Sequence, residues 1–140
     1  MQIYVRAFVA GFLSTLAFHQ VLYLLLHLAG VLPNAPFNLE PRPPLGVPAV
    51  ISLAFWGGLW GMGIWYLMRH ATGRAYWIRA IVFGAIFPTA AALLFFYPIK
   101  NNWSFALATN PGYWVIGFVL NGFWGLGLGL LMRGLKRVGL

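Results

Sequence analysis

Polar side chains recur at intervals of four residues along the first apolar segment of the chain. Residues at this spacing lie above one another on a helix. The stripe consists of Gly11, Thr15, His19, Tyr23 and His27, with Gln20 beside it. Polar groups at membrane depth face a bundle interior or an aqueous cavity, because exposure to lipid is costly. The stripe therefore predicts the inner face of this helix, where an imidazole can bind a ligand or bond to another helix.

Asn121 and Thr89 are expected at about the same depth as His19. At a rise of about 1.5 Å per residue, His19 and Asn121 each lie about 18 Å above the basic ends of their segments. We therefore predict a polar layer near the midplane that contains His19, Asn121, Thr89, Thr15, Tyr23 and Gln20. Two interpretations stay open. Either these groups hold helices together, at about 0.6 kcal/mol per hydrogen bond, or they line a site for a small ligand or permeating substrate.

A haem or quinone site at His19 is a third interpretation. Bis-histidine ligation needs imidazoles that face each other from different helices, whereas His19 and His27 share one segment and lie about 12 Å apart along it. The sequence contains no cysteine and no carboxylate within an apolar segment, and it matches no common catalytic or metal-binding motif. We therefore expect no bound metal, no cofactor and no enzymatic activity.

Composition identifies the elements that position these residues. The chain of 140 residues is 61% apolar and 7% charged, whereas soluble domains carry about 25% charged residues. Four apolar runs, 7–29, 48–68, 78–97 and 113–132, have the length of about 20 residues that a hydrocarbon core requires. The alternation typical of β-barrel strands is missing. We predict a single all-α integral membrane domain over residues 1–140 with four transmembrane helices, the first retained rather than cleaved as a signal peptide.

Seven of the nine Lys and Arg residues lie at the same ends of these segments. They are Arg6, Arg69, Arg74, Arg79, Arg133, Lys136 and Arg137. The positive-inside rule then predicts that both termini are cytoplasmic. An Arg-led first helix, a proline-rich outer loop and a W-G-x-G helix together resemble small bacterial inner-membrane proteins, so we expect a multi-pass protein of the bacterial inner membrane. The formal net charge of +8 indicates contact with anionic lipid rather than with nucleic acid.

Two parts of the sequence echo each other. GLWGMGIWYLMR at 58–69 aligns without a gap to GFWGLGLGLLMR at 122–133, and YVRAFVAG at 4–11 resembles WIRAIVFG at 77–84. We predict two tandem copies of a two-helix unit, with halves 1–72 and 73–140. Because each copy crosses twice, the copies are parallel and related by a pseudo-twofold axis along the membrane normal.

Glycines and tryptophans of the second and fourth segments predict where helices pack. Small residues four apart let helix backbones approach, and an indole N–H inside a membrane needs an acceptor. The expected packing residues are Gly57, Gly58, Gly61, Gly122, Gly125, Gly129, Trp60 and Trp124. We expect the second and fourth helices to form the central contact, within one protomer or between two. The proline-rich outer loop, 31–47, is interpreted either as a stiff partner or gate surface or as a simple spacer.

These features favour a non-catalytic inner-membrane protein, a scaffold or accessory subunit of a membrane assembly. Its expected partners are the lipid bilayer and either a second copy or another membrane protein, with no nucleic acid. The alternative is a small transporter or channel with a mid-membrane site at His19, Asn121 and Thr89, as duplicated transporters often arrange it. A haem- or quinone-binding membrane subunit is the third hypothesis.

Overall fold

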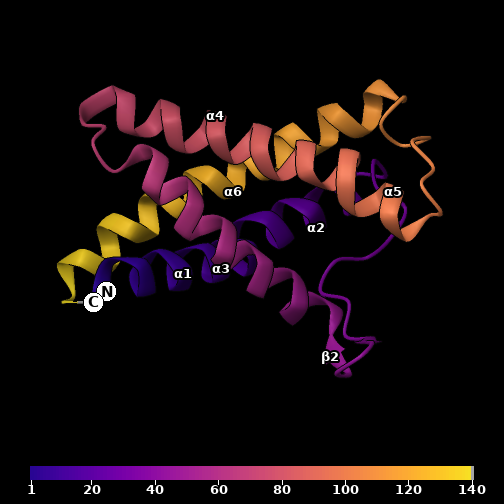
Figure 1. The fold of residues 1–140 in the computed structure, drawn as a ribbon, viewed down its shortest axis with the longest axis horizontal. Helices are drawn as coiled ribbons and strands as arrows, with labels where there is room; N and C mark the ends of the chain where they lie inside the picture. The colour runs from indigo at the N-terminus through magenta and orange to yellow at the C-terminus, as the bar shows by residue number, and fades with distance from the viewer. Residues whose placement is uncertain (140) are drawn as a thin grey trace.

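Four long helices form the bundle (Figure 1). The computed structural model describes residues 1–139. The first helix runs through α1 (Gln2–Ser14), the π-helical turn η1 (Thr15–His19) and α2 (Gln20–Leu28), and the second is α3 (Ala49–Met68). The third runs through α4 (Gly73–Ala91), the π-helical turn η2 (Ala92–Phe96) and α5 (Tyr97–Lys100), and the fourth is α6 (Pro111–Arg137).

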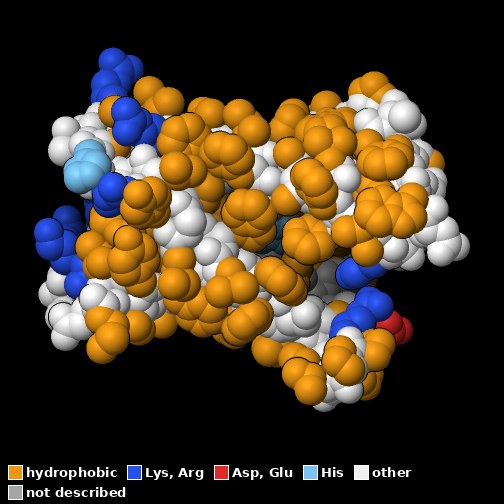
Figure 2. Space-filling model, viewed as in Figure 1, with side chains coloured by type: hydrophobic (Ala, Val, Ile, Leu, Met, Phe, Trp, Pro, Cys, Tyr) orange, Lys and Arg blue, Asp and Glu red, His pale blue; other side chains and the backbone are white. Residues whose placement is uncertain are grey.

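All four helices are long and apolar enough to cross a membrane, which confirms the prediction of a helical membrane bundle. Only 28% to 44% of the most apolar stretch of each helix is buried in the bundle. On the face shown in Figure 2, apolar side chains cover most of the surface between the two ends of the bundle. A surface of this kind is stable where lipid, not water, surrounds it.

The two ends of the bundle differ in charge. Both termini lie at one end (Figure 1), and most of the blue Lys and Arg side chains gather at the same end (Figure 2). We call this the basic end and define it by Arg6, Arg69, Arg133 and Lys136. The other end, the loop end, carries residues 29–48 and 101–110.

The proline-rich loop folds into a short hairpin at the loop end. Strand β1 (Pro41–Arg42) pairs antiparallel with β2 (Val47–Pro48). The backbone N–H of Ala49 donates to Glu40 O at 3.0 Å, so the loop is fastened to the first turn of α3. These bonds satisfy amide groups that a loop without regular structure leaves open.

Glycines bring α1 onto α3 and α4 onto α6 with their backbones in contact. A Cβ on Gly61 of α3 would lie 2.5 Å from Ala7 O and 3.0 Å from Gly11 Cα of α1. A Cβ on Gly125 of α6 would clash with Ala80 O and lie 3.2 Å from Gly84 Cα of α4. Each crossing is therefore formed by a small residue on both helices.

The two hairpins are joined mainly by α1 and α6 rather than by the second and fourth helices. Gly127 of α6 lies against the Ser14 hydroxyl and the Phe18 ring of the first helix. The expected central contact between α3 and α6 does not form in this protomer. The reason is that Gly57 and Gly61 of α3 are already covered by the first helix, whereas Gly125 and Gly129 of α6 are covered by α4.

Candidate functional site

Trp124 joins α6 to the polar stripe of α1 at the centre of the bundle. Its indole N–H donates to Gly11 O at 3.0 Å and lies 3.1 Å from Thr15 Oγ1. Thr15 Oγ1 donates to Gly11 O at 3.0 Å, and Ser14 Oγ donates to the Trp124 carbonyl at 2.6 Å. Because the Trp124 side chain is only 3% exposed, these groups satisfy one another without water.

Replacing Trp124 by phenylalanine is expected to lower the free energy of unfolding by about 1 to 2 kcal/mol, because the indole donor is lost and two buried acceptors lose a partner. A double-mutant cycle with Thr15→Val is expected to give a coupling energy of about 0.6 kcal/mol. The measurement is denaturant-induced unfolding in detergent micelles. Trp103→Phe is the matched control, since Trp103 is 68% exposed, and equal effects of the two tryptophan substitutions would contradict the prediction.

Thr89 and Asn121 form a second polar contact, within the hairpin of α4 and α6. Asn121 Nδ2 donates to Thr89 Oγ1 at 2.9 Å. Gly117 makes room for the threonine, since a Cβ there would lie 2.5 Å from Thr89 Cγ2. Among residues 1–139, neither side chain is hydrogen-bonded to His19. The predicted layer therefore contains Thr89 and Asn121 as a pair of their own.

His19 and Gln20 form a third cluster with the outer loop. Gln20 Nε2 lies 3.3 Å from His19 Nδ1, and the backbone N–H of Phe37 donates to Gln20 Oε1 at 2.7 Å. Phe37 itself has a left-handed backbone, with φ of 55°, which is strained for a residue with a Cβ. The loop is thus held against the start of α2 instead of standing free above the bundle.

The π-helical turn η1 explains why the predicted stripe divides into separate clusters. A π turn needs about one residue more than an α turn to return to the same face. Five residues after Thr15, the residue on its face is therefore Gln20, which is 5% exposed, while His19 is only partly buried. A spacing of four residues places His19 on the same face as Thr15 only if the helix is α-helical throughout.

The remaining polar residues of the stripe, Tyr23 and His27, lie toward the loop end of the first helix. Tyr23 is partly buried and has no hydrogen bond among the described residues. His27 Nδ1 lies 2.8 Å from Leu32 O and so helps to close the turn after α2. Within residues 1–139, no group of three or more His, Cys, Asp or Glu side chains has a geometry that could hold a metal ion.

The expected packing residues are used within the protomer. Gly57 and Gly61 face α1, Gly58 lies under the Phe8 ring, and Gly125 and Gly129 face α4. Trp60 and Trp124 pack in or against the apolar core. Gly122 is buried and also faces α4, where Ala85 Cβ and Ile81 Cγ2 lie 3.5 and 3.7 Å from a built Cβ. It lines an open groove of about 360 Å³ formed by Leu22, Ile81, Phe118, Val119, Gly122, Phe123 and Leu126.

Two residues that join the helices were not among the predicted ones. Ser14 bonds to the Trp124 carbonyl, and the Tyr76 hydroxyl donates to Gly129 O at 2.8 Å. Ser14 adjoins Thr15 and lies three residues beyond Gly11, so the stripe itself is the signal that pointed to it. Tyr76 stands near the start of α4, where an interfacial tyrosine gives no sign of an acceptor on another helix.

No family model matches the chain, and no curated protein or solved structure is similar to it. The geometry therefore carries the functional argument. At membrane depth it offers hydrogen-bonded contacts between helices, together with an open apolar groove.

Proposed function

We propose that this protein is a non-catalytic scaffold or accessory subunit of an assembly in the bacterial inner membrane. The observation that supports the proposal is that polar groups within the apolar helices form hydrogen bonds to other parts of the protein. Trp124 bonds to α1, Asn121 to Thr89 and Gln20 to the loop. Groups committed in this way hold helices in register and are not available to bind a substrate.

The groove around Gly122 is the surface that we assign to the partner. It lies between α2, α4 and α6, and its lining is entirely apolar. Gly122 lies at the floor of this groove, buried against Ile81 and Ala85 of α4. A transmembrane helix of another subunit, or of a second copy, would gain close packing there, which is the main attraction between helices in lipid.

We further propose that the bundle consists of two tandem copies of a hairpin, with halves 1–72 and 73–140. The support is the equivalence of the two crossings. Gly61 meets Ala7 and Gly11, and Gly125 meets Ala80 and Gly84. The spacings are those of the sequence echoes, 73 residues between the first helices and 64 between the second ones. Parallel copies of this kind have a pseudo-twofold axis along the membrane normal.

The proposed orientation has both termini in the cytoplasm. Its support is the concentration of Lys and Arg at the end where the termini lie (Figures 1 and 2). Cytoplasmic loops carry this excess in membrane proteins generally.

The partner surface is tested with Val119→Trp in the full-length protein, tagged and purified from its native membrane in a mild detergent. Val119 lines the groove and is 48% exposed, so the larger ring obstructs the groove from its open side. The amount of companion subunit or second copy that co-purifies is expected to fall at least about tenfold, which corresponds to 1.4 kcal/mol of association free energy. Val115→Trp is the control, since Val115 lies one turn away on the same helix, is 60% exposed and does not line the groove.

Thermal unfolding of both variants checks that neither fails to fold. A wild-type protein that purifies as a lone protomer, without companion or self-association, would contradict the scaffold proposal. If both variants lose the co-purifying partner to the same extent, the groove is not the contact surface.

A further inference from the structure

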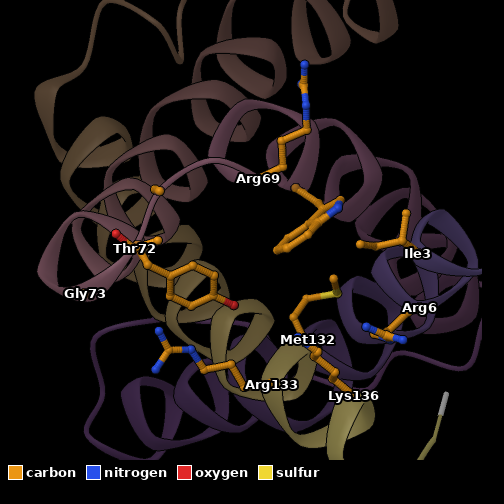
Figure 3. A pocket seen from close by; sticks show the side chains of 11 residues that line it. Ile3, Arg6, Arg69, Thr72, Gly73, Met132, Arg133 and Lys136 are labelled. Carbon is orange, nitrogen blue, oxygen red and sulfur yellow. The ribbon is translucent and has the colours of Figure 1, made fainter.

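A cavity of about 400 Å³ opens at the basic end, between the ends of all four long helices (Figure 3). Arg6 comes from α1, Arg69 follows α3, and Arg133 and Lys136 come from α6. Figure 3 shows Arg6, Arg133 and Lys136 on one side of the cavity together with Met132, and Ile3 beside Arg6. Arg69 stands on the opposite side, and its guanidinium is directed away from the cavity. The cavity therefore combines three cationic side chains with an apolar wall, and Arg69 adds a fourth positive charge at its edge.

No carboxylate side chain of the protein balances these charges. The one acidic residue of the chain is Glu40, and it lies just before β1, at the loop end. Four cations around one cavity repel each other, and the low polarity of nearby lipid strengthens that repulsion. An anion bound among them would relieve it.

Arg6 gives a second, independent indication of a missing partner. Its Nε atom is buried and has no hydrogen-bond acceptor among residues 1–139. A buried N–H without an acceptor is unfavourable and rare in folded proteins. The atom belongs to a side chain that lines the cavity, so an oxygen atom of a bound group would be its natural acceptor.

The other arginines are held at the rim by aromatic rings. The Arg133 guanidinium lies 4.3 Å from the centre of the Tyr76 ring and 4.7 Å from that of Trp77. The Arg69 guanidinium lies 3.7 Å from the Tyr66 ring centre and donates to Tyr66 O at 2.5 Å. Stacking of this kind fixes the direction of the guanidinium while leaving N–H groups at its edge free to bond.

The geometry points to a binding site for a phosphate group in this cavity. Arginine forks match the oxygens of phosphate in spacing and charge. The site lies where the helices meet the membrane surface, and its apolar wall suits the glycerol and upper acyl region of a lipid. The phosphate belongs either to an anionic phospholipid headgroup or to a small phosphate compound in solution, and the experiment separates these two sources.

The test measures binding of phosphatidylglycerol, phosphatidylcholine and inorganic phosphate to the purified full-length protein in detergent. Native mass spectrometry counts bound lipid, and equilibrium dialysis measures phosphate. We expect Arg6→Gln and, separately, Lys136→Gln to weaken binding of the anionic ligand about tenfold, as expected when one charge-assisted hydrogen bond is lost. The matched control is Arg79→Gln, because Arg79 is exposed, does not line the cavity and corresponds to Arg6 in the sequence echo. Its binding is expected to change less than twofold.

The outcomes are distinct. Phosphatidylglycerol binding that depends on Arg6 and resists competition by phosphate assigns the site to a lipid headgroup. Dialysis that detects phosphate binding dependent on Arg6 assigns it to a soluble phosphate. Equal losses in the Arg6→Gln and Arg79→Gln variants would reduce the site to a general basic surface and overturn the proposal, as would the absence of any anionic binding to the wild-type protein. Should Arg6→Gln not fold, Lys136→Gln decides, since its side chain is exposed at the rim.

Discussion

Gly125→Ala is expected to lower the free energy of unfolding by about 2 to 3 kcal/mol, the upper part of the range typical of overpacking. The added methyl group would clash with the carbonyl oxygen of Ala80, which belongs to the backbone of α4 and has no rotamer to change. The helices of the second hairpin would have to move apart, and contacts along the whole crossing would weaken. Unfolding in detergent, followed by tryptophan fluorescence and far-UV circular dichroism, measures the effect.

Gly134→Ala is the matched control, because Gly134 lies on the same helix and a Cβ there meets nothing within 4 Å. Alanine favours helix over glycine by up to about 1 kcal/mol, so this variant should be unchanged or slightly more stable. The first hairpin offers the same comparison, with Gly61→Ala against Gly63→Ala on α3. Equal stability of the crossing and control variants would show that backbone contact is not what holds the hairpins.

Gly127→Val is expected to weaken the contact between the two hairpins by about 2 kcal/mol while each hairpin keeps its helices. Gly127 faces α1 and η1, and its side chain would occupy the space of the Ser14 hydroxyl and the root of the Phe18 ring. Because the overlap includes Cγ of Phe18, where the ring joins the side chain, rotation of the phenyl group does not relieve it.

Unfolding of this variant should therefore occur in two steps, with a loss of tertiary fluorescence signal before the loss of helical circular dichroism. Gly134→Val is the control, since it adds the same β-branched side chain at an open position of α6. A single cooperative transition in Gly127→Val, at the same denaturant concentration as in the control, would contradict the prediction.

The sequence was sufficient to predict the four membrane helices, because length and hydropathy are local properties of each segment. It also brought Thr89 and Asn121 to one depth, and they are hydrogen-bonded. Depth alone gives no direction around the helix axis. Whether His19 or Gln20 lies on the same helix face as Thr15 depends on the π turn, which no residue pattern in the sequence predicts.

Helix pairing was the other feature that the sequence left open. Glycines on α3 and α6 suggested that these helices touch each other, but Gly11 and Gly84 provide equally small surfaces on their hairpin neighbours. A small residue at the matching height of a neighbouring helix then decides the partner, and a GxxxG pattern names only one side of a contact. The bond between Gln20 and Phe37 was likewise beyond prediction, since it joins a side chain to the backbone of an irregular loop.

The bond from Trp124 to Gly11 spans 113 positions of the chain, and this separation has a consequence for biogenesis. The first helix is synthesised long before Trp124, the residue whose indole N–H contacts the Gly11 carbonyl and the Thr15 hydroxyl. The glycine contacts of each hairpin join helices of the same half of the chain, so they can form before synthesis ends, whereas the seam between the first and last helices can close only at the end. Newly inserted chains thus pass through a stage in which the Thr15 hydroxyl has no partner on another helix, and insertion of the final segment ends it.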